Sequence, residues 1–295
     1  MRLRISPSPL SPPARGGETV HLVGIVEITD MKCVLGIDMG SAAAKGVLLA
    51  GETILAQVEF PSGGDFKLTA DRIREELLAK ARVPAKSISY TVATGFGSKS
   101  VSYSDSILTD ISCHAKGVIH LCPTVRTAVD AGDLYSKAFR VDEKGNLQNF
   151  LLSGKCAGGS ARILKVAAKV LQLKVEDLGD LSLKSRKRVE FNTGCAVFAE
   201  SEAVSRIAEG VTKEDLLAGI HRALAAQFNA LAVRLGIEKD YALVGGGARN
   251  EGLVKALEAM SGFPILVPPD PHMTAALGAA LTASESLSNQ FLSRS

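Results

Sequence analysis

The sequence predicts an α/β protein made of two related domains, and three of its features support this. The chain has 295 residues, a length that suits two domains better than one. Short apolar runs typical of strands alternate with longer stretches that have helical spacing. The pattern Asp-x-Gly-x4-Lys begins at Asp38 and again at Asp130, each time between two apolar runs. A repeat in the same strand–turn–strand setting indicates a duplicated domain.

The chain divides into three parts. Residues 1–30 are rich in proline and arginine, show no regular period and lack the apolar core and cleavage site of a secretory signal. Because Met31 stands just before the first apolar run, we expect either a misassigned start codon or a disordered or weakly targeting extension. The first domain is expected at 31–122 and the second at 123–295, with a final helix that is able to pack back on the first domain.

The first domain is expected to contain three strands, a helix, a strand and a second helix. Residues 33–60 contain three apolar runs separated by turns, which is typical of a meander. Residues 68–83 have an apolar stripe at helical spacing, and 87–97 form a strand that runs into a glycine turn. Residues 106–122 are expected to be helical up to Pro123.

The second domain repeats this opening and then becomes more helical. Residues 126–141 form a second strand–turn–strand unit, and 143–152 form a further arm. The remaining expected elements are helices up to Leu171 and over 196–210, 213–236, 251–262 and 272–283, with strands within 241–250 and 263–268.

Composition excludes several classes of protein. The net charge is only +3, there is no Trp and there are four Tyr, so a nucleic-acid surface with stacking aromatics is not expected. Charges or glycines interrupt every apolar run before it reaches the roughly 18 to 20 residues needed to cross a bilayer, so no membrane span is expected. The five cysteines are scattered and odd in number, which favours a reducing compartment, with the cytoplasm as the default.

The two repeated turns have the features of phosphate-binding turns. A carboxylate at a strand end can hold Mg2+ directly or through water, while small residues let backbone N–H groups approach an anion. Asp38 and Asp130 are the candidate catalytic carboxylates. The candidate nucleotide contacts here are Gly40, Ser41, Ala42, Lys45 and Gly132. Taken alone, each turn is a weak signal and is more typical of a solvated aspartate followed by a glycine that permits a positive φ.

A third glycine-rich stretch, Gly245 to Gly247 followed by Asn250, ends a predicted strand and opens a helix. Such a surface without side chains can accept a nucleotide's phosphates or sugar. It has neither Walker A nor Rossmann spacing. Together with the two hairpin turns, it resembles the superfamily of actin, heat-shock chaperone ATPases and sugar kinases. That resemblance implies two duplicated ribonuclease-H-like domains with ATP in the cleft between them.

Within that superfamily the chain resembles the 2-hydroxyacyl-CoA dehydratase activators and the benzoyl-CoA reductase ATPase subunits. The stretches that carry the resemblance span residues 33–283 and include "GIDMGSAAAKG", "ATGFG", "ISCHAKG", "SGKCAGGSARIL", "CAVFAESEAVS", "VGGGARNEGLVKALE" and "ALGAALTA". The resemblance implies an electron-transfer ATPase that is a homodimer or a pseudo-dimer with a related subunit. It further implies a [4Fe-4S] cluster between the subunits, with Cys113 and Cys156 as the ligands from each chain. Cys33, Cys122 and Cys195 are interpreted as buried apolar residues.

The resemblance also implies a mechanism and partners. ATP binding and hydrolysis would change the angle between the domains and couple docking to electron transfer. Electrons would come from ferredoxin or flavodoxin and pass to the partner, a 2-hydroxyacyl-CoA dehydratase. The alternative partner is a benzoyl-CoA-reductase-like complex, of which this chain would be a subunit. A cluster-free small-molecule kinase and a nucleotide-dependent scaffold remain alternatives on the same fold.

The sequence departs from the family pattern at the second turn. The usual stretch is Asp-Ile-Gly-Gly-Gln-Asp, but here Asp133 stands for a glycine and Leu134 for the glutamine. The first change narrows backbone access to phosphate, and the second removes a polar group able to orient water. The rate of hydrolysis is therefore open on sequence grounds, as is the choice between a homodimeric activator and a reductase subunit.

Overall fold

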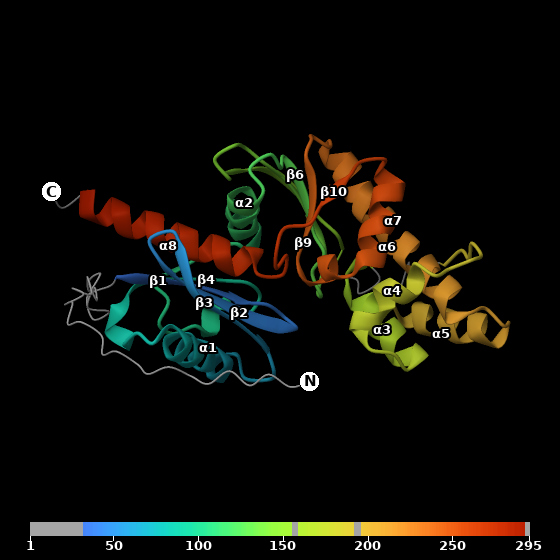
Figure 1. Cartoon of the computed structure of the whole chain (residues 1–295), viewed down its shortest axis with the longest axis horizontal. Helices are drawn as coiled ribbons and strands as arrows, with labels where there is room; N and C mark the ends of the chain where they lie inside the picture. The colour runs from blue at the N-terminus through green and yellow to red at the C-terminus, as the bar shows by residue number, and fades with distance from the viewer. Residues whose placement is uncertain (1–31, 155–158, 192–195, 293–295) are drawn as a thin grey trace, which may run out of the picture.

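The computed structural model describes residues 32–154, 159–191 and 196–292. Two five-stranded mixed sheets stand next to each other, with most of the helices on the far side of the second sheet (Figure 1). The first sheet has the order β3-β2-β1-β4-β5 and the second the order β8-β7-β6-β9-β10. The strands are β1 (Cys33–Met39), β2 (Ala43–Ala50), β3 (Thr53–Pro61), β4 (Ile88–Thr94), β5 (Ser106–Ile107), β6 (Thr127–Asp130), β7 (Lys137–Val141), β8 (Leu147–Leu152), β9 (Tyr241–Val244) and β10 (Ile265–Leu266).

The two sheets confirm the predicted duplication. In each sheet the first three strands are antiparallel and the fourth lies parallel to the first. The register pairs Asp38 with Lys45 and Asp130 with Lys137. The repeated sequence pattern therefore places an aspartate and a lysine opposite each other at the end of both hairpins.

Eight α-helices lie within the described residues. They are α1 (Phe66–Ala81), α2 (Asp110–Leu121), α3 (Arg162–Leu171), α4 (Leu178–Ser182), α5 (Ala196–Ala208), α6 (Lys213–Leu235), α7 (Glu251–Ser261) and α8 (Thr274–Leu292). The helix expected over 106–122 begins only at Asp110, because Thr109 caps it by accepting a hydrogen bond from the Ser112 backbone N–H. The preceding residues form β5 instead.

Helix α6 has the length and apolar composition of a membrane-spanning helix, the single described segment that does. However, 56% of its most apolar window is buried inside the protein. Leu217, Leu224 and Phe228 belong to the core of the second domain. The apolar character of α6 is thus accounted for by packing within this core.

The last helix of each half packs on the sheet of the other half. Helix α2 follows the first sheet but contributes Ala115 and Val118 to a core formed with Phe139 of the second sheet. Helix α8 follows the second sheet but covers β1, β2 and β4 of the first (Figure 1). The two helices also pack against each other. This exchange joins the two halves directly beneath the cleft between them.

Glycines set the close approach of α8 to its neighbours. A Cβ on Gly278 would lie 1.7 Å from the Cys113 carbonyl oxygen, and one on Gly117 would lie 2.0 Å from the Thr274 carbonyl oxygen. At Gly36 of β1 a Cβ would meet the Ala276 carbonyl oxygen at 2.2 Å. The backbones therefore touch, and no larger residue fits at these positions without moving an element.

Candidate nucleotide site

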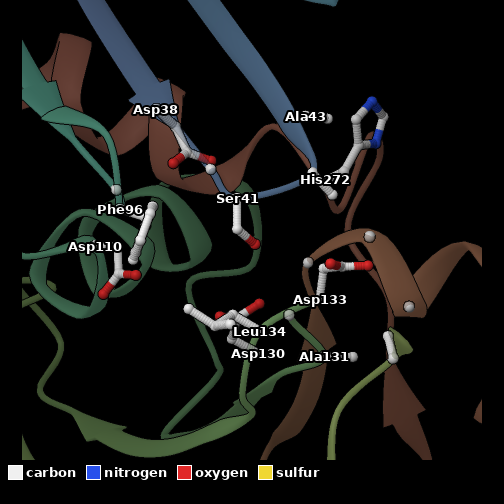
Figure 2. Close-up of a pocket in the computed structure, with 18 of the residues that line it drawn as sticks. Asp38, Ser41, Ala43, Phe96, Asp110, Asp130, Ala131, Asp133, Leu134 and His272 are labelled. Carbon is white, nitrogen blue, oxygen red and sulfur yellow. The ribbon is translucent and has the colours of Figure 1, made fainter. Parts of the chain in front are cut away.

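A cleft with a volume of about 320 Å³ opens between the two sheets. Both hairpin turns and the glycine strand end line it, so the three predicted motifs meet in one place. Figure 2 shows Asp38 and Asp130 on opposite sides of this pocket. The predicted residues that line it are Asp38, Gly40, Ser41, Ala42, Lys45, Asp130, Gly132, Gly245, Gly246 and Gly247.

The first turn holds a buried ion pair. Asp38 is 6% exposed, and its Oδ2 atom lies 3.1 Å from the Nζ atom of Lys45. Burial alone would lower the pKa of Lys45, but the carboxylate of Asp38 raises it above its usual value. The turn itself is fixed by Ser62, whose hydroxyl donates to the Gly40 carbonyl oxygen over 2.6 Å.

The second turn repeats this pair and adds a further carboxylate. Lys137 Nζ lies 2.7 Å from Asp130 Oδ2 and 2.8 Å from Asp110 Oδ2 at the start of α2. Burial would raise the pKa of Asp130, but the ammonium group of Lys137 lowers it below its usual value. Burial would likewise lower the pKa of Lys137, whereas Asp130 and Asp110 raise it. Both groups are therefore charged at neutral pH, and Lys137 is shared by two acids.

Two equivalent glycines let Asp38 and Asp130 lie against the neighbouring strand ends. Gly95 follows β4 with φ +88°, and Gly245 follows β9 with φ +83°. A Cβ on Gly95 would lie 2.4 Å from Asp38 Oδ1, and one on Gly245 would lie 2.1 Å from Asp130 Oδ1. Each glycine thus provides both a left-handed turn and room for a carboxylate.

His114 connects the second turn to α8. Its Nδ1 atom lies 2.7 Å from the Thr274 hydroxyl, which in turn donates to the Pro271 carbonyl oxygen over 3.0 Å. With the single hydroxyl proton directed to Pro271, Nδ1 is the donor to Thr274. Burial lowers the pKa of His114, so the ring is neutral, with Nε2 lying 3.6 Å from Asp130.

Several cleft residues were not predicted from the sequence. Glu59 belongs to β3, whose alternating pattern marks it only as an outward-facing position, and His272 was expected only as the first residue of the last helix. Phe96 lies within the quoted stretch "ATGFG", which was a usable signal. The unpredicted lining residues include Glu59, Phe96, Asp110, His114, Lys165 and His272.

Asn250 was predicted to contact the nucleotide, but the structure gives it another role. Its side-chain oxygen accepts a hydrogen bond of 3.0 Å from the Leu253 backbone N–H and so caps α7. The residue is 8% exposed and lies against Gly179. The polar side chain after the glycines is therefore used to start the helix.

Cys113, predicted as a cluster ligand, lies in the core of the protein. It is 0% exposed, it packs among Val34, Val92 and the alanines of α8, and burial raises the pKa of its thiol to about 12. A ligand shared between two subunits must reach the surface as a thiolate. This position does not allow that. Cys156, the second predicted ligand, lies outside the described residues.

Two ribonuclease-H-like sheets whose paired Asp–Lys turns face a cleft have the arrangement of the actin-like ATPase fold. The sequence matches the model of the BadF/BadG/BcrA/BcrD ATPase family over residues 35–283. The chain belongs to this family, and it is an ATPase.

Individual relatives agree with this assignment. The chain is 40% identical to the 2-hydroxyisocaproyl-CoA dehydratase activator of Clostridioides difficile over 84% of this chain and 94% of the relative. It is 29% identical to one of the subunits of benzoyl-CoA reductase from Thauera aromatica, over 85% of this chain and 93% of the relative. A solved structure of the activator of the 2-hydroxyisocaproyl-CoA dehydratase from Clostridium difficile with bound ADPNP superposes with a TM-score of 0.83 at 37% identity, covering 88% of this chain and 97% of the other.

Proposed function

We propose that the protein is an ATP-dependent activator that passes low-potential electrons from ferredoxin or flavodoxin to a 2-hydroxyacyl-CoA dehydratase. It would act as a homodimer, or as a pseudo-dimer with a related subunit, around one [4Fe-4S] cluster. Family membership and the names of the relatives support a dehydratase or reductase partner. The cluster, the dimer and the electron donor belong to the proposal.

The observation that carries this proposal is the set of hydrogen bonds made by Ser136 at the end of the second phosphate turn. Ser136 is fully buried. Its backbone N–H donates to Ser153 Oγ and its carbonyl oxygen accepts from the Ser153 N–H, both over 2.9 Å. Its hydroxyl donates to the Gly159 carbonyl oxygen, also over 2.9 Å. Ser153 and Gly159 flank the stretch that contains Cys156. A movement of the turn would therefore shift the backbone on both sides of that cysteine.

The cleft fits a nucleotide bound with Mg2+. Asp38 and Asp130 supply the hard carboxylate oxygens that Mg2+ prefers, and both already pair with lysine, which favours contact through water. The metal would neutralise and orient the phosphates. Lys45 and Lys137 would add positive charge, and the backbone N–H groups of the two turns and of Gly245 to Gly247 would hold the phosphate oxygens.

The burial of Cys113 changes the expected ligand set. Cys156 stays in the proposal, and a second thiol is needed from each chain. Cys195 directly precedes Ala196, the first residue of α5, and α5 packs against α3, which begins shortly after Cys156. Cys122 ends α2, which lies well away from α3 in Figure 1. We therefore propose Cys156 and Cys195 as the pair, with the cluster supplying a site that accepts and releases one electron.

Iron analysis of cysteine variants after anaerobic purification tests this. We expect about four iron atoms per two chains, with broad visible absorbance that bleaches on reduction. Cys156→Ser and Cys195→Ser should each lose the iron and the ability to activate a dehydratase. Cys113→Ser is the matched control and should keep both. Colourless, iron-free wild-type protein that phosphorylates a sugar would instead identify a kinase.

One observation favours the reductase alternative. The second turn departs from the family pattern at Asp133 and Leu134, as expected where a divergent subunit works beside a more regular one. Copurification distinguishes the two. An activator should form a homodimer and restore dehydratase activity alone, whereas a reductase subunit should copurify with, and depend on, a second ATPase subunit.

A further inference from the structure

The second phosphate turn is tied to helix α3 by four contacts close together in space. The Ala161 N–H donates to the Gly132 carbonyl oxygen, and the Ser160 hydroxyl donates to the Asp133 carbonyl oxygen, each over 2.9 Å. The Asp133 carboxylate then binds two cations of α3. Arg162 lies 3.0 Å away through Nη2, and Lys165 lies 2.7 Å away through Nζ.

This cluster of charges belongs to the wall of the nucleotide cleft. Asp133 and Lys165 both line the cavity, and Asp133 follows Gly132 in the turn where phosphate is expected. Figure 2 shows Asp133 at the pocket, beside Leu134 and Asp130. The Asp133 side chain is 18% exposed, whereas Arg162 and Lys165 are 42% and 54% exposed. Because both cationic side chains are about half exposed, they can leave the carboxylate without breaking a core contact. Lys165 lines the cavity, and Arg162 directly follows Ala161, which also lines it.

The carboxylate and a phosphate compete for the same partners. Burial would raise the pKa of Asp133, but Lys165 and Arg162 lower it, so the group is an anion at neutral pH. A nucleotide phosphate in this turn would be repelled by an unneutralised carboxylate and attracted by the same two cations. An arginine and a lysine suit phosphate oxygens as well as they suit a carboxylate.

We propose that Asp133, Arg162 and Lys165 form a phosphate-sensing latch, in which the two cations leave Asp133 to bind the terminal phosphate of ATP. With ADP bound, the ion pairs to Asp133 hold α3 against the turn. With ATP bound, the two cations pair with the nucleotide, and the ion pairs that join the Asp133 carboxylate to α3 are broken. The proposal rests on the proposed function only in placing ATP in the cleft, and it does not require the cluster.

Binding of ADP and of a non-hydrolysable ATP analogue to single and combined variants tests the latch. Arg162→Gln and Lys165→Gln should each weaken binding of the ATP analogue by about fivefold and change ADP affinity by less than about twofold. The size of the effect follows because a half-exposed ion pair contributes up to about 1 kcal/mol. Asp133→Asn should tighten binding of the ATP analogue by about threefold, because both cations are then released from the carboxylate. Lys169→Gln, on the same helix but 80% exposed, is the control and should change neither affinity.

The combined variants separate the latch from simple repulsion. If Asp133 acts by holding the cations, Asp133→Asn should have no effect when Arg162 and Lys165 are both glutamine. If Asp133→Asn tightens both nucleotides equally, or still tightens the analogue in that background, Asp133 merely repels phosphate and the latch is wrong. Wild-type protein that binds neither nucleotide would overturn the proposed function itself.

Discussion

Lys137 neutralises the acidic side chains at the second turn, because it is a buried cation that forms ion pairs with both Asp130 and Asp110. Replacing it by Met leaves two carboxylates without a counter-charge in a site with little solvent. We expect Lys137→Met to lower the free energy of unfolding by about 3 kcal/mol at neutral pH. Guanidinium unfolding measures this. Lys169→Met, on an exposed lysine, should change it by less than about 0.5 kcal/mol.

The same variant should also change the pH dependence of stability. In the wild type the pKa of Asp130 is lowered, so its contribution is present above the unfolded value of about 3.9 and is lost as the pH falls through the folded pKa. Without Lys137, burial raises this pKa, and the native state then binds the extra proton. The destabilisation by Lys137→Met should therefore be smaller at pH 5 than at pH 7. Equal destabilisation at pH 5 and pH 7 would show that the pKa of Asp130 does not depend on Lys137.

Single residues also show where sequence reasoning ends. Asp38, Asp130 and the glycines of the strand end were predicted, because a carboxylate or glycine at a strand end already specifies its position. Cys113 and Asn250 were misplaced for a common reason. Neither the resemblance nor the motif shows how a side chain is packed, and the structure places Cys113 in the core and uses Asn250 to cap a helix.

At the level of elements, the contact of α2 with α8 leaves the least space for a larger side chain. We expect Gly278→Ala to lower the free energy of unfolding by about 3 kcal/mol, since its Cβ would overlap the Cys113 carbonyl oxygen and force the helices apart. Thermal or chemical unfolding measures this. Ser288→Thr adds one methyl group at an exposed position of α8 and should leave stability within about 0.5 kcal/mol.

The hairpins were predictable as elements, whereas the exchange of α2 and α8 was only partly so. Strand period and turn chemistry are local, so the sequence determines β1 to β3 and β6 to β8 within a few residues. Which sheet a helix covers depends on contacts between residues far apart in the chain. The sequence therefore indicated only that the last helix is able to pack back on the first domain.

For the molecule as a whole, side chains at the rim of the cleft connect the two domains. Glu59 of the first sheet lies 3.4 Å from Arg249 and 3.5 Å from His272 of the second half. Gln57 donates to Asp270 over 3.0 Å nearby. These contacts are partly exposed, so they bias the angle between the domains without locking it.

Glu59→Gln should therefore favour a more open molecule. We expect a larger radius of gyration by X-ray scattering and nucleotide binding that is weaker by about twofold, since the ion pair with Arg249 is lost while the shape of the side chain is kept. Glu52→Gln, an exposed charge in the turn before β3, is the matched control. An unchanged radius of gyration in Glu59→Gln would mean that these pairs do not influence domain closure.

The exchange of the last helices has a consequence for how the protein is made. During synthesis β1 to β4 leave the ribosome early, but α8, which covers one face of their sheet, is translated about 180 residues later. At ordinary rates of protein synthesis this delay is on the order of tens of seconds. The apolar face formed by Val34, Val47 and Val92 remains uncovered during that time. Nascent chains are therefore expected to need protection by chaperones, and truncation before Thr274 should yield aggregation rather than a stable half.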